Sequence, residues 1–279
     1  MIEVVVGLII GLVLGLTGAG GSIFAVPLLL LATPMNPSDA MGMALGAVAV
    51  TALYATASQS INRKNSGILW TPAIILAASG ALTAPLGKWA STLFTPHVLL
   101  AGFTCVAVLI AVRMWIQANR RPEETTSVRA NDGDSDLTTP ATMACKLSPT
   151  GQFLLRPKCI SGLGVGGLAI GFASGLFGVG GGFLIIPLLL FLSQIAMRNA
   201  VATSLAIIAA VSSSGFASHL VLEYSNNQTF DWLNFIKLSG ASLTAMFISQ
   251  RISRAIAGPL LQKIFSVALV LVSVISILK

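Results

Sequence analysis

The chain has 279 residues, of which 55% are hydrophobic and 9% charged, and its formal net charge is +7. Soluble proteins average roughly 45–50% apolar and about 25% charged residues, so this composition excludes an ordinary soluble domain and indicates an integral membrane protein. The apolar runs are about 20 residues long and do not alternate, which predicts membrane-spanning helices and argues against a barrel. The basic residues lie mostly in predicted loops, where they set membrane orientation, so no nucleic-acid partner is expected.

Apolar runs between polar breaks predict two sets of four segments. The first set is an interrupted segment at 2–32 followed by spans near 38–61, 68–87 and 97–118. The second set is an interrupted segment at 160–193 followed by spans near 197–222, 231–250 and 259–278. Between the sets, a charged stretch rich in Ser, Thr and Pro cannot bury enough apolar surface to fold alone. We expect a first transmembrane repeat at 1–118, a polar, disordered cytoplasmic linker at 119–158 and a second repeat at 159–279.

A Gly-rich break occurs twice inside the apolar chain, 160 residues apart. Residues 7–30 and 167–190 are identical at 13 of 24 positions when aligned at this offset. The match extends into later spans, where Ser79-Gly80-Ala81 corresponds to Ser239-Gly240-Ala241. Duplicated, interrupted apolar segments are typical of transporters whose site lies at broken helices between two repeats. The chain is therefore expected to consist of two homologous halves, each an interrupted segment plus three transmembrane helices.

The distribution of basic residues bears on how the halves are oriented. If each interrupted segment crosses the membrane once, the halves are parallel and the linker's side holds 9 bases against 4, with Lys88 taken as a loop residue. If each is instead a re-entrant hairpin, the halves are inverted and the counts become 11 against 2. The positive-inside rule favours inverted repeats with the linker in the cytoplasm, and parallel halves remain the alternative.

The two breaks are candidate anion sites. A broken helix leaves backbone N–H groups unpaired, and the short helix that follows points its positive end at them. The candidate residues are Gly18, Ala19, Gly20, Gly21 and Ser22 in the first break and Gly178, Val179, Gly180, Gly181 and Gly182 in the second. The alternative is that such glycines only allow close helix packing, and this is the preferred interpretation of Gly7, Gly11 and Gly15.

Polar side chains in the second span of each half are further candidates, because they are costly in lipid and usually face the protein interior. Hydroxyl and amide donors suit an oxyanion. The candidate ligands are Thr51, Ser58, Gln59, Ser204, Ser214, Ser218 and His219, and Thr56, Ser212 and Ser213 add hydroxyls to the same spans. The alternative for each Ser or Thr is a bond within its own helix. His219 could bind the anion, carry a proton or lie at the interface. The acidic residues outside the linker lie near predicted span ends, so the coupling ion is left open.

The duplicated GxGGG-type core at 18–22 and 178–182, followed by Pro27 or Pro187, resembles the sulfite exporter TauE/SafE family. The small-residue second span and the later Gly-Ala segments add to this resemblance, which covers both halves. It implies a bacterial inner-membrane permease for sulfite, sulfonates such as sulfoacetate, and related small anions.

We therefore expect a secondary transporter of small sulfur oxyanions or organosulfonates that works by alternating access between the repeats. Its partners would be the anion and the lipid bilayer. No enzymatic activity, cofactor or metal is expected. No Walker lysine follows either break, so the chain is not expected to hydrolyse ATP by itself. The alternatives are a channel-like transporter of another small organic anion and a non-transporting membrane assembly factor. The sequence does not indicate an oligomeric state.

Overall fold

The computed structural model describes residues 2–17, 20–61, 67–120, 146–147, 153–154, 157–192, 197–225, 230–256 and 267. The first half contains α1 (Ile2–Thr17), the short 3₁₀ helix η1 (Gly20–Phe24), α2 (Ala25–Ala32), α3 (Pro37–Ile61), α4 (Trp70–Ser91) and α5 (Pro96–Arg120). The second half contains α7 (Pro157–Phe177), α8 (Gly182–Leu192), α9 (Met197–Ser225) and α10 (Trp232–Ile256). The two-residue strands β1 (Lys146–Leu147) and β2 (Phe153–Leu154) pair antiparallel within the segment predicted as the linker.

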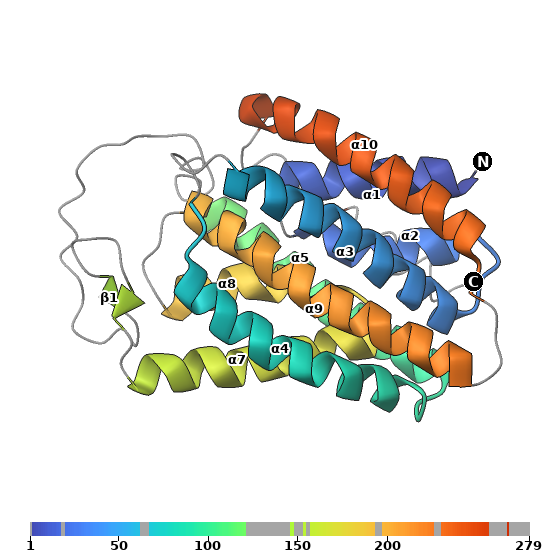
Figure 1. Ribbon diagram of the computed structural model, residues 1–279, viewed down its shortest axis with the longest axis horizontal. Helices are drawn as coiled ribbons and strands as arrows, with labels where there is room; N and C mark the ends of the chain where they lie inside the picture. Colours follow the sequence, from blue (N-terminus) through green and yellow to red (C-terminus); the bar gives the residue numbers. More distant parts are fainter. Residues whose placement is uncertain are drawn as a thin grey trace.

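The prediction of an all-α multi-pass membrane protein is confirmed in the described residues. Four helical stretches are long and apolar enough to cross a membrane: Pro37–Ile61, Trp70–Ser91, Cys159–Phe177 and Asn199–Ser225. They lie side by side in one bundle with the shorter helices (Figure 1). The span predicted at 259–278 lies outside the described residues, apart from Val267.

Each interrupted segment folds back on itself. In the first half, Ile2 and Ile9 of α1 line the same surface hollow as Leu28 and Ala32 of α2, so the end of α2 lies beside the beginning of α1. Figure 1 shows this return of the chain next to the N-terminus. Proline tolerates the first turn of a helix, where its missing N–H has no partner to lose, and Pro27 lies in the first turn of α2. The break therefore separates two antiparallel helices.

The second interrupted segment repeats this arrangement. A Cβ atom added to Gly162 in α7 would lie 3.0 Å from Leu192 in α8, and one added to Gly166 would touch Leu188. The residue numbers fall along α8 as they rise along α7, so these two helices are antiparallel as well.

The glycine stripe of α1 packs against α10 of the other half. Cβ atoms added to Gly7 and Gly11 would collide with the main-chain oxygens of Leu238 and Ser242. Small residues let membrane helices approach until their backbones touch. The packing interpretation of this stripe is therefore confirmed, and α1 runs parallel to α10.

The equivalent glycines of α7 make the equivalent contact with α4. A Cβ atom on Gly171 would collide with the main-chain oxygen of Gly80, and one on Gly175 with that of Ala84. Each half thus contributes its first helix to a tight pair with a helix of the other half, and the two halves are interlaced.

Between these pairs, α3 and α9 cross at the centre of the bundle. Gly42 faces His219 and Gly46 faces Phe216, so the two helices run antiparallel. Every residue of α3 from 40 to 49 is buried. This stretch consists of Ala, Gly, Met, Leu and Val, which have no polar group to satisfy in the interior.

The packing of α7 on α4 predicts different outcomes for two glycines of α7. Gly171→Ala places a methyl group against the backbone of α4, and overpacking of this kind costs about 1–3 kcal/mol. At Gly164 an added Cβ atom meets nothing within 4 Å, so Gly164→Ala is expected to leave the stability unchanged or slightly raised. Thermal unfolding of the two purified variants in the same detergent tests this difference, and equal midpoints would contradict the packing described here.

Candidate functional site

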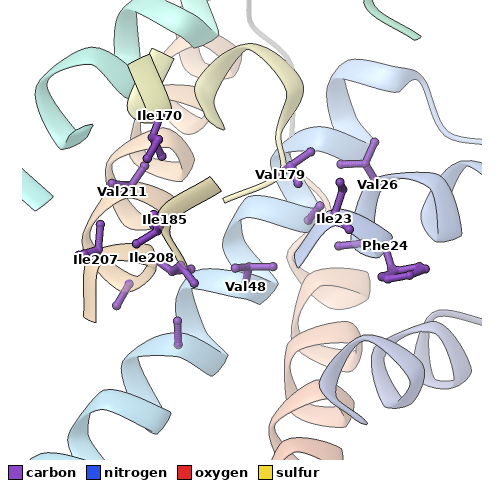
Figure 2. Close-up of a cluster of buried hydrophobic side chains, with 14 of the residues drawn as sticks. Ile23, Phe24, Val26, Val48, Ile170, Val179, Ile185, Ile207, Ile208 and Val211 are labelled. Carbon is purple, nitrogen blue, oxygen red and sulfur yellow. The ribbon is translucent and has the colours of Figure 1, made fainter. Parts of the chain in front are cut away.

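The two breaks meet at the centre of the protein. Val179 of the second break lies beside Ile23 of η1 and Val26 of α2, which follow the first break, within the buried hydrophobic cluster (Figure 2). A Cβ atom on Gly180 would lie 3.6 Å from that of Ser22 and 3.0 Å from Val48 of α3. The chain therefore brings together two segments that the sequence separates by 160 residues.

The second break has a backbone that only glycine adopts readily. Gly178, Gly180 and Gly181 have φ angles of +70°, +70° and +68°, in the region where an L side chain is strained. The N–H of Gly178 donates to Ser174 O at 2.9 Å and closes the end of α7. Within the described residues, the backbone amides of Val179, Gly180 and Gly181 make no hydrogen bond. These amides precede α8, whose N-terminus carries the positive end of the helix dipole.

Two buried hydroxyl groups lie next to these amides. Ser212 of α9 is fully buried, and its Oγ would be 2.7 Å from a Cβ atom on Gly180. Ser174 of α7 is 1% exposed and packs beside Gly181. Neither Oγ atom has a hydrogen-bond partner in the described part of the chain. A buried polar group without a partner costs free energy, so unpaired hydroxyls beside unpaired amides indicate a place for a ligand or water.

We use the term cradle for the amides of Val179, Gly180 and Gly181 together with the hydroxyls of Ser174 and Ser212. An amide N–H donates only, and a hydroxyl can turn its hydrogen toward an acceptor. The cradle therefore suits a small group with several acceptor oxygens, and it has no carboxylate that would repel an anion.

Only some of the predicted ligands are described at the meeting point of the two breaks. Ser22 and the second-break glycines lie at the meeting point of the breaks, whereas Gly18 and Ala19 lie outside the described residues. Gly20 and Gly21 begin η1. Ser174 was missed by the sequence reasoning, since its helix has the pattern of a small-residue packing face.

Most predicted hydroxyl ligands of the second spans bond to backbone carbonyl groups. Thr51 donates to Ala47 O at 2.8 Å, Ser58 to Ala55 O at 2.9 Å and Ser204 to Val201 O at 2.8 Å, all within their own helices. Ser214 donates across to Ala81 O of α4 at 2.6 Å. These bonds support the alternative interpretation, helix and packing contacts. Gln59 and Ser218 are partly buried.

His219 belongs to a second polar group, some distance along α9. It is 1% exposed, and its Nε2 lies 3.3 Å from Oε1 of Glu223. Lys88 of α4 is also 1% exposed, and its Nζ lies 3.1 Å from Oγ of Ser38. The predicted loop position of Lys88 is wrong: α4 continues to Ser91, and this side chain is buried against the beginning of α3.

Among the described residues, no group of three or more His, Cys, Asp or Glu side chains could hold a metal ion. Cys105 is free and exposed, and Cys159 at the beginning of α7 is disulfide-bonded.

The unpaired state of the cradle hydroxyls predicts their effect on stability. Ser212→Ala removes a buried hydroxyl that has no partner, so the free energy of unfolding is expected to stay the same or rise. Ser214→Ala removes the bond to Ala81 O and leaves this carbonyl unpaired, which costs about 1–3 kcal/mol. Denaturant unfolding of the two variants, with no anion added, measures the difference, and a larger loss for Ser212→Ala would show that its hydroxyl is already satisfied.

Comparison with known proteins identifies the family. The model of the family described as "Sulfite exporter TauE/SafE" matches residues 4–275. Two proteins named "Probable membrane transporter protein" from Xylella fastidiosa strains Temecula1 and 9a5c are 30% and 32% identical over 227 residues, which cover 81% of this chain and 74% of each relative. "Probable membrane transporter protein YunE" of Bacillus subtilis (strain 168) is 27% identical over 284 residues, covering 98% of this chain and 95% of the relative. No solved structure matches the chain significantly. The chain belongs to the sulfite exporter TauE/SafE family of membrane transporters.

Proposed function

We propose that this protein carries small sulfur oxyanions or organosulfonates across the bacterial inner membrane, by alternating access at a site between its two halves. The observation that carries the proposal is the cradle. Its three backbone amides and two buried hydroxyls make no hydrogen bond to any described residue. The family description, sulfite exporter, supports a sulfur oxyanion as the substrate.

The chemistry of the cradle favours a transported anion over a tightly held one. Neutral donors stabilise an oxyanion without the strong attraction of a buried arginine, and a transporter has to release what it binds. A sulfonate or sulfite group presents three oxygens, which matches a set of donors from α7, the second break and α9. Transport without chemical conversion also fits this site, which offers no nucleophile paired with a base and no carboxylate pair.

The alternating-access part of the proposal rests on inverted halves. The helices α3 and α9 occupy equivalent places in the two halves and run antiparallel, as inverted repeats require. With the span predicted at 259–278 counted, two antiparallel hairpins at the breaks would give each half an odd number of crossings. With Lys88 removed from the loop bases, the counts are 9 against 3 for parallel halves and 11 against 1 for inverted halves, so the preference for inversion is unchanged.

Two observations bear on the side of the membrane on which the linker lies, and they favour opposite sides. The excess of basic residues favours the cytoplasm. The disulfide at Cys159, which is just after the linker, is a bond that is rare in the cytosol. We propose the cytoplasmic placement, because the base count draws on the whole chain.

Inverted halves predict that the ends of α3 and α9 face opposite sides. Ile61 and Tyr224 are 84% and 87% exposed, and each can be replaced by Cys in a Cys105→Ser background. A membrane-impermeant maleimide applied to intact cells is expected to label Tyr224→Cys and to reach Ile61→Cys only after the cells are opened. Labelling of both positions from one side would exclude inversion, and the reverse pattern would place the linker outside.

The cradle predicts selective anion binding that depends on its hydroxyls. Purified protein is heated with sulfite, sulfate, thiosulfate, sulfoacetate, taurine or lactate, and a rise in unfolding temperature reports binding. A hydrogen bond to a charged group contributes about 1.5–3 kcal/mol, so Ser174→Ala and Ser212→Ala should each raise the Kd at least about tenfold.

Ser213→Ala is the matched control, because Ser213 donates to Ala209 O at 2.6 Å within its own helix and lies next to Ser212. This variant is expected to bind like the wild type. A sulfur-anion shift that survives the loss of both cradle hydroxyls, or no shift with any of these anions, would refute the cradle as the binding site.

A further inference from the structure

A buried charged cluster lies at one end of the bundle, where the beginning of α3 meets the ends of α4 and α9. We define the charged cluster as Lys88, His219 and Glu223 with their neighbours Ser38 and Asp39. Lys88 and His219 are both 1% exposed, and Glu223 is 9% exposed. Such groups are rare in membrane-spanning helices, and where they occur they mark substrate or ion pathways and proton relays.

The carboxylate of Glu223 is buried without a direct lysine or arginine partner among the described residues. Lys88 is the buried cation of the cluster, and Asp39 is a partly buried neighbour that adds negative charge at its edge. The Nζ of Lys88 contacts only the neutral Ser38, at 3.1 Å from its Oγ and 3.5 Å from its main-chain O, among the described residues. A buried carboxylate without a paired cation is unfavourable. Binding one proton would neutralise Glu223, whereas binding an anion beside it would add repulsion.

The pair formed by His219 and Glu223 has a place for that proton. Nε2 of His219 lies 3.3 Å from Oε1 of Glu223, one helical turn away on α9. A bare imidazole nitrogen and a carboxylate oxygen are both acceptors, so at this distance a proton on either atom stabilises the pair. Oε2 of Glu223 has no hydrogen-bond partner in the described part of the chain.

The groups packed around the pair are few and come from three directions. Asp39 on α3 and Lys88 on α4 act electrostatically on Glu223, and Lys88 also acts on His219. On the side of α10, the ring of Phe230 lies 6.1 Å from the imidazole. Asp231 and Lys237, the charged residues described there, are exposed. The proton affinity of the pair therefore depends on one buried cation and one neighbouring carboxylate.

The charged cluster is connected to the cradle through two helices. His219 and Ser212 are seven residues apart on α9, which puts them on one face of the helix at about 10.5 Å along its axis. On α4, the main-chain N of Lys88 would lie 2.9 Å from a Cβ atom on Gly175, the neighbour of Ser174. A change of charge at the cluster can thus shift both helices that supply the cradle hydroxyls.

We propose that the His219–Glu223 pair, held beside Lys88, is the proton-binding site that couples proton movement to anion transport. Glu223 has the more exposed side chain, 11% against 2% for His219, so a proton from water on this side of the membrane reaches Glu223 first. The pair takes up one proton here and releases it to water after the conformational change. The inference rests on the proposed anion transport and adds the coupling ion to it.

The first experiment tests the proton site without any anion. Purified wild type, Glu223→Gln and His219→Gln are titrated potentiometrically in weakly buffered detergent solution. Gln occupies the position equivalent to His219 in the first half, Gln59, and it keeps a polar side chain at this place. The wild type is expected to take up about one more proton per molecule than either variant across the neutral range, where a glutamate of ordinary pKa, about 4.3, stays ionised. Lys237→Gln, which alters an exposed lysine on α10, is the matched control.

The second experiment tests coupling in liposomes that contain a pH-sensitive dye. An inward gradient of sulfoacetate is expected to drive protons inward with the wild type and the Lys237→Gln control. Glu223→Gln should lose this proton flux at least tenfold and keep the exchange of labelled for unlabelled sulfoacetate, which requires a folded protein but no net proton movement.

The outcomes separate the two proposals. Proton flux in Glu223→Gln and His219→Gln equal to that of the wild type, or identical titrations of all four proteins, would overturn the proton site. A wild type that shows the extra titrating proton and moves no sulfoacetate would support the proton site and count against the proposed transport of this anion.

Discussion

The tight backbone contact between a glycine-striped helix of each half and a helix of the other half determines the rest of this structure. Lipid tails are as apolar as leucine side chains, so membrane helices gain little from hydrophobicity when they associate and depend on close packing instead. Gly7 and Gly11 on α1, and Gly171 on α7, bring backbones together where any side chain would collide. Because these two pairs join opposite halves, the remaining helices, α3 and α9, are left to cross at the centre.

The interlaced pairs also explain why the breaks lie where they do. Each glycine-striped helix ends at a break, and each break turns toward the middle of the bundle, so the segments around Ser22 and Gly180 approach each other. The buried apolar side chains of both segments pack together there (Figure 2). In these apolar surroundings, the amides of the second break and the hydroxyls of Ser174 and Ser212 are polar groups without a hydrogen-bond partner among the described residues.

Much of the fold was predictable from the sequence, since apolar runs and duplicated glycines are local signals. The end of α4 was misplaced because a lysine normally ends an apolar run, whereas Lys88 is buried by the beginning of α3, a contact between distant segments. The candidate site was less predictable. Ser204 and Ser212 look alike in the sequence, yet the first bonds to its own helix and the second has no partner in the described residues. Ser212 differs from Ser204 in lying beside Gly180 of the second break, a contact between distant segments.

The interlacing of the halves has a consequence for biogenesis. Gly7 meets its partner Leu238 only after 231 further residues have been synthesised. Until α10 enters the bilayer, the glycine face of α1 has no helix to cover it, and contacts between such distant segments form late and leave intermediates exposed. During synthesis, the first half is therefore in the membrane with the glycine face of α1 uncovered. Membrane chaperones and the speed of translation should then influence the yield of native protein more than substitutions at its lipid-facing surface do.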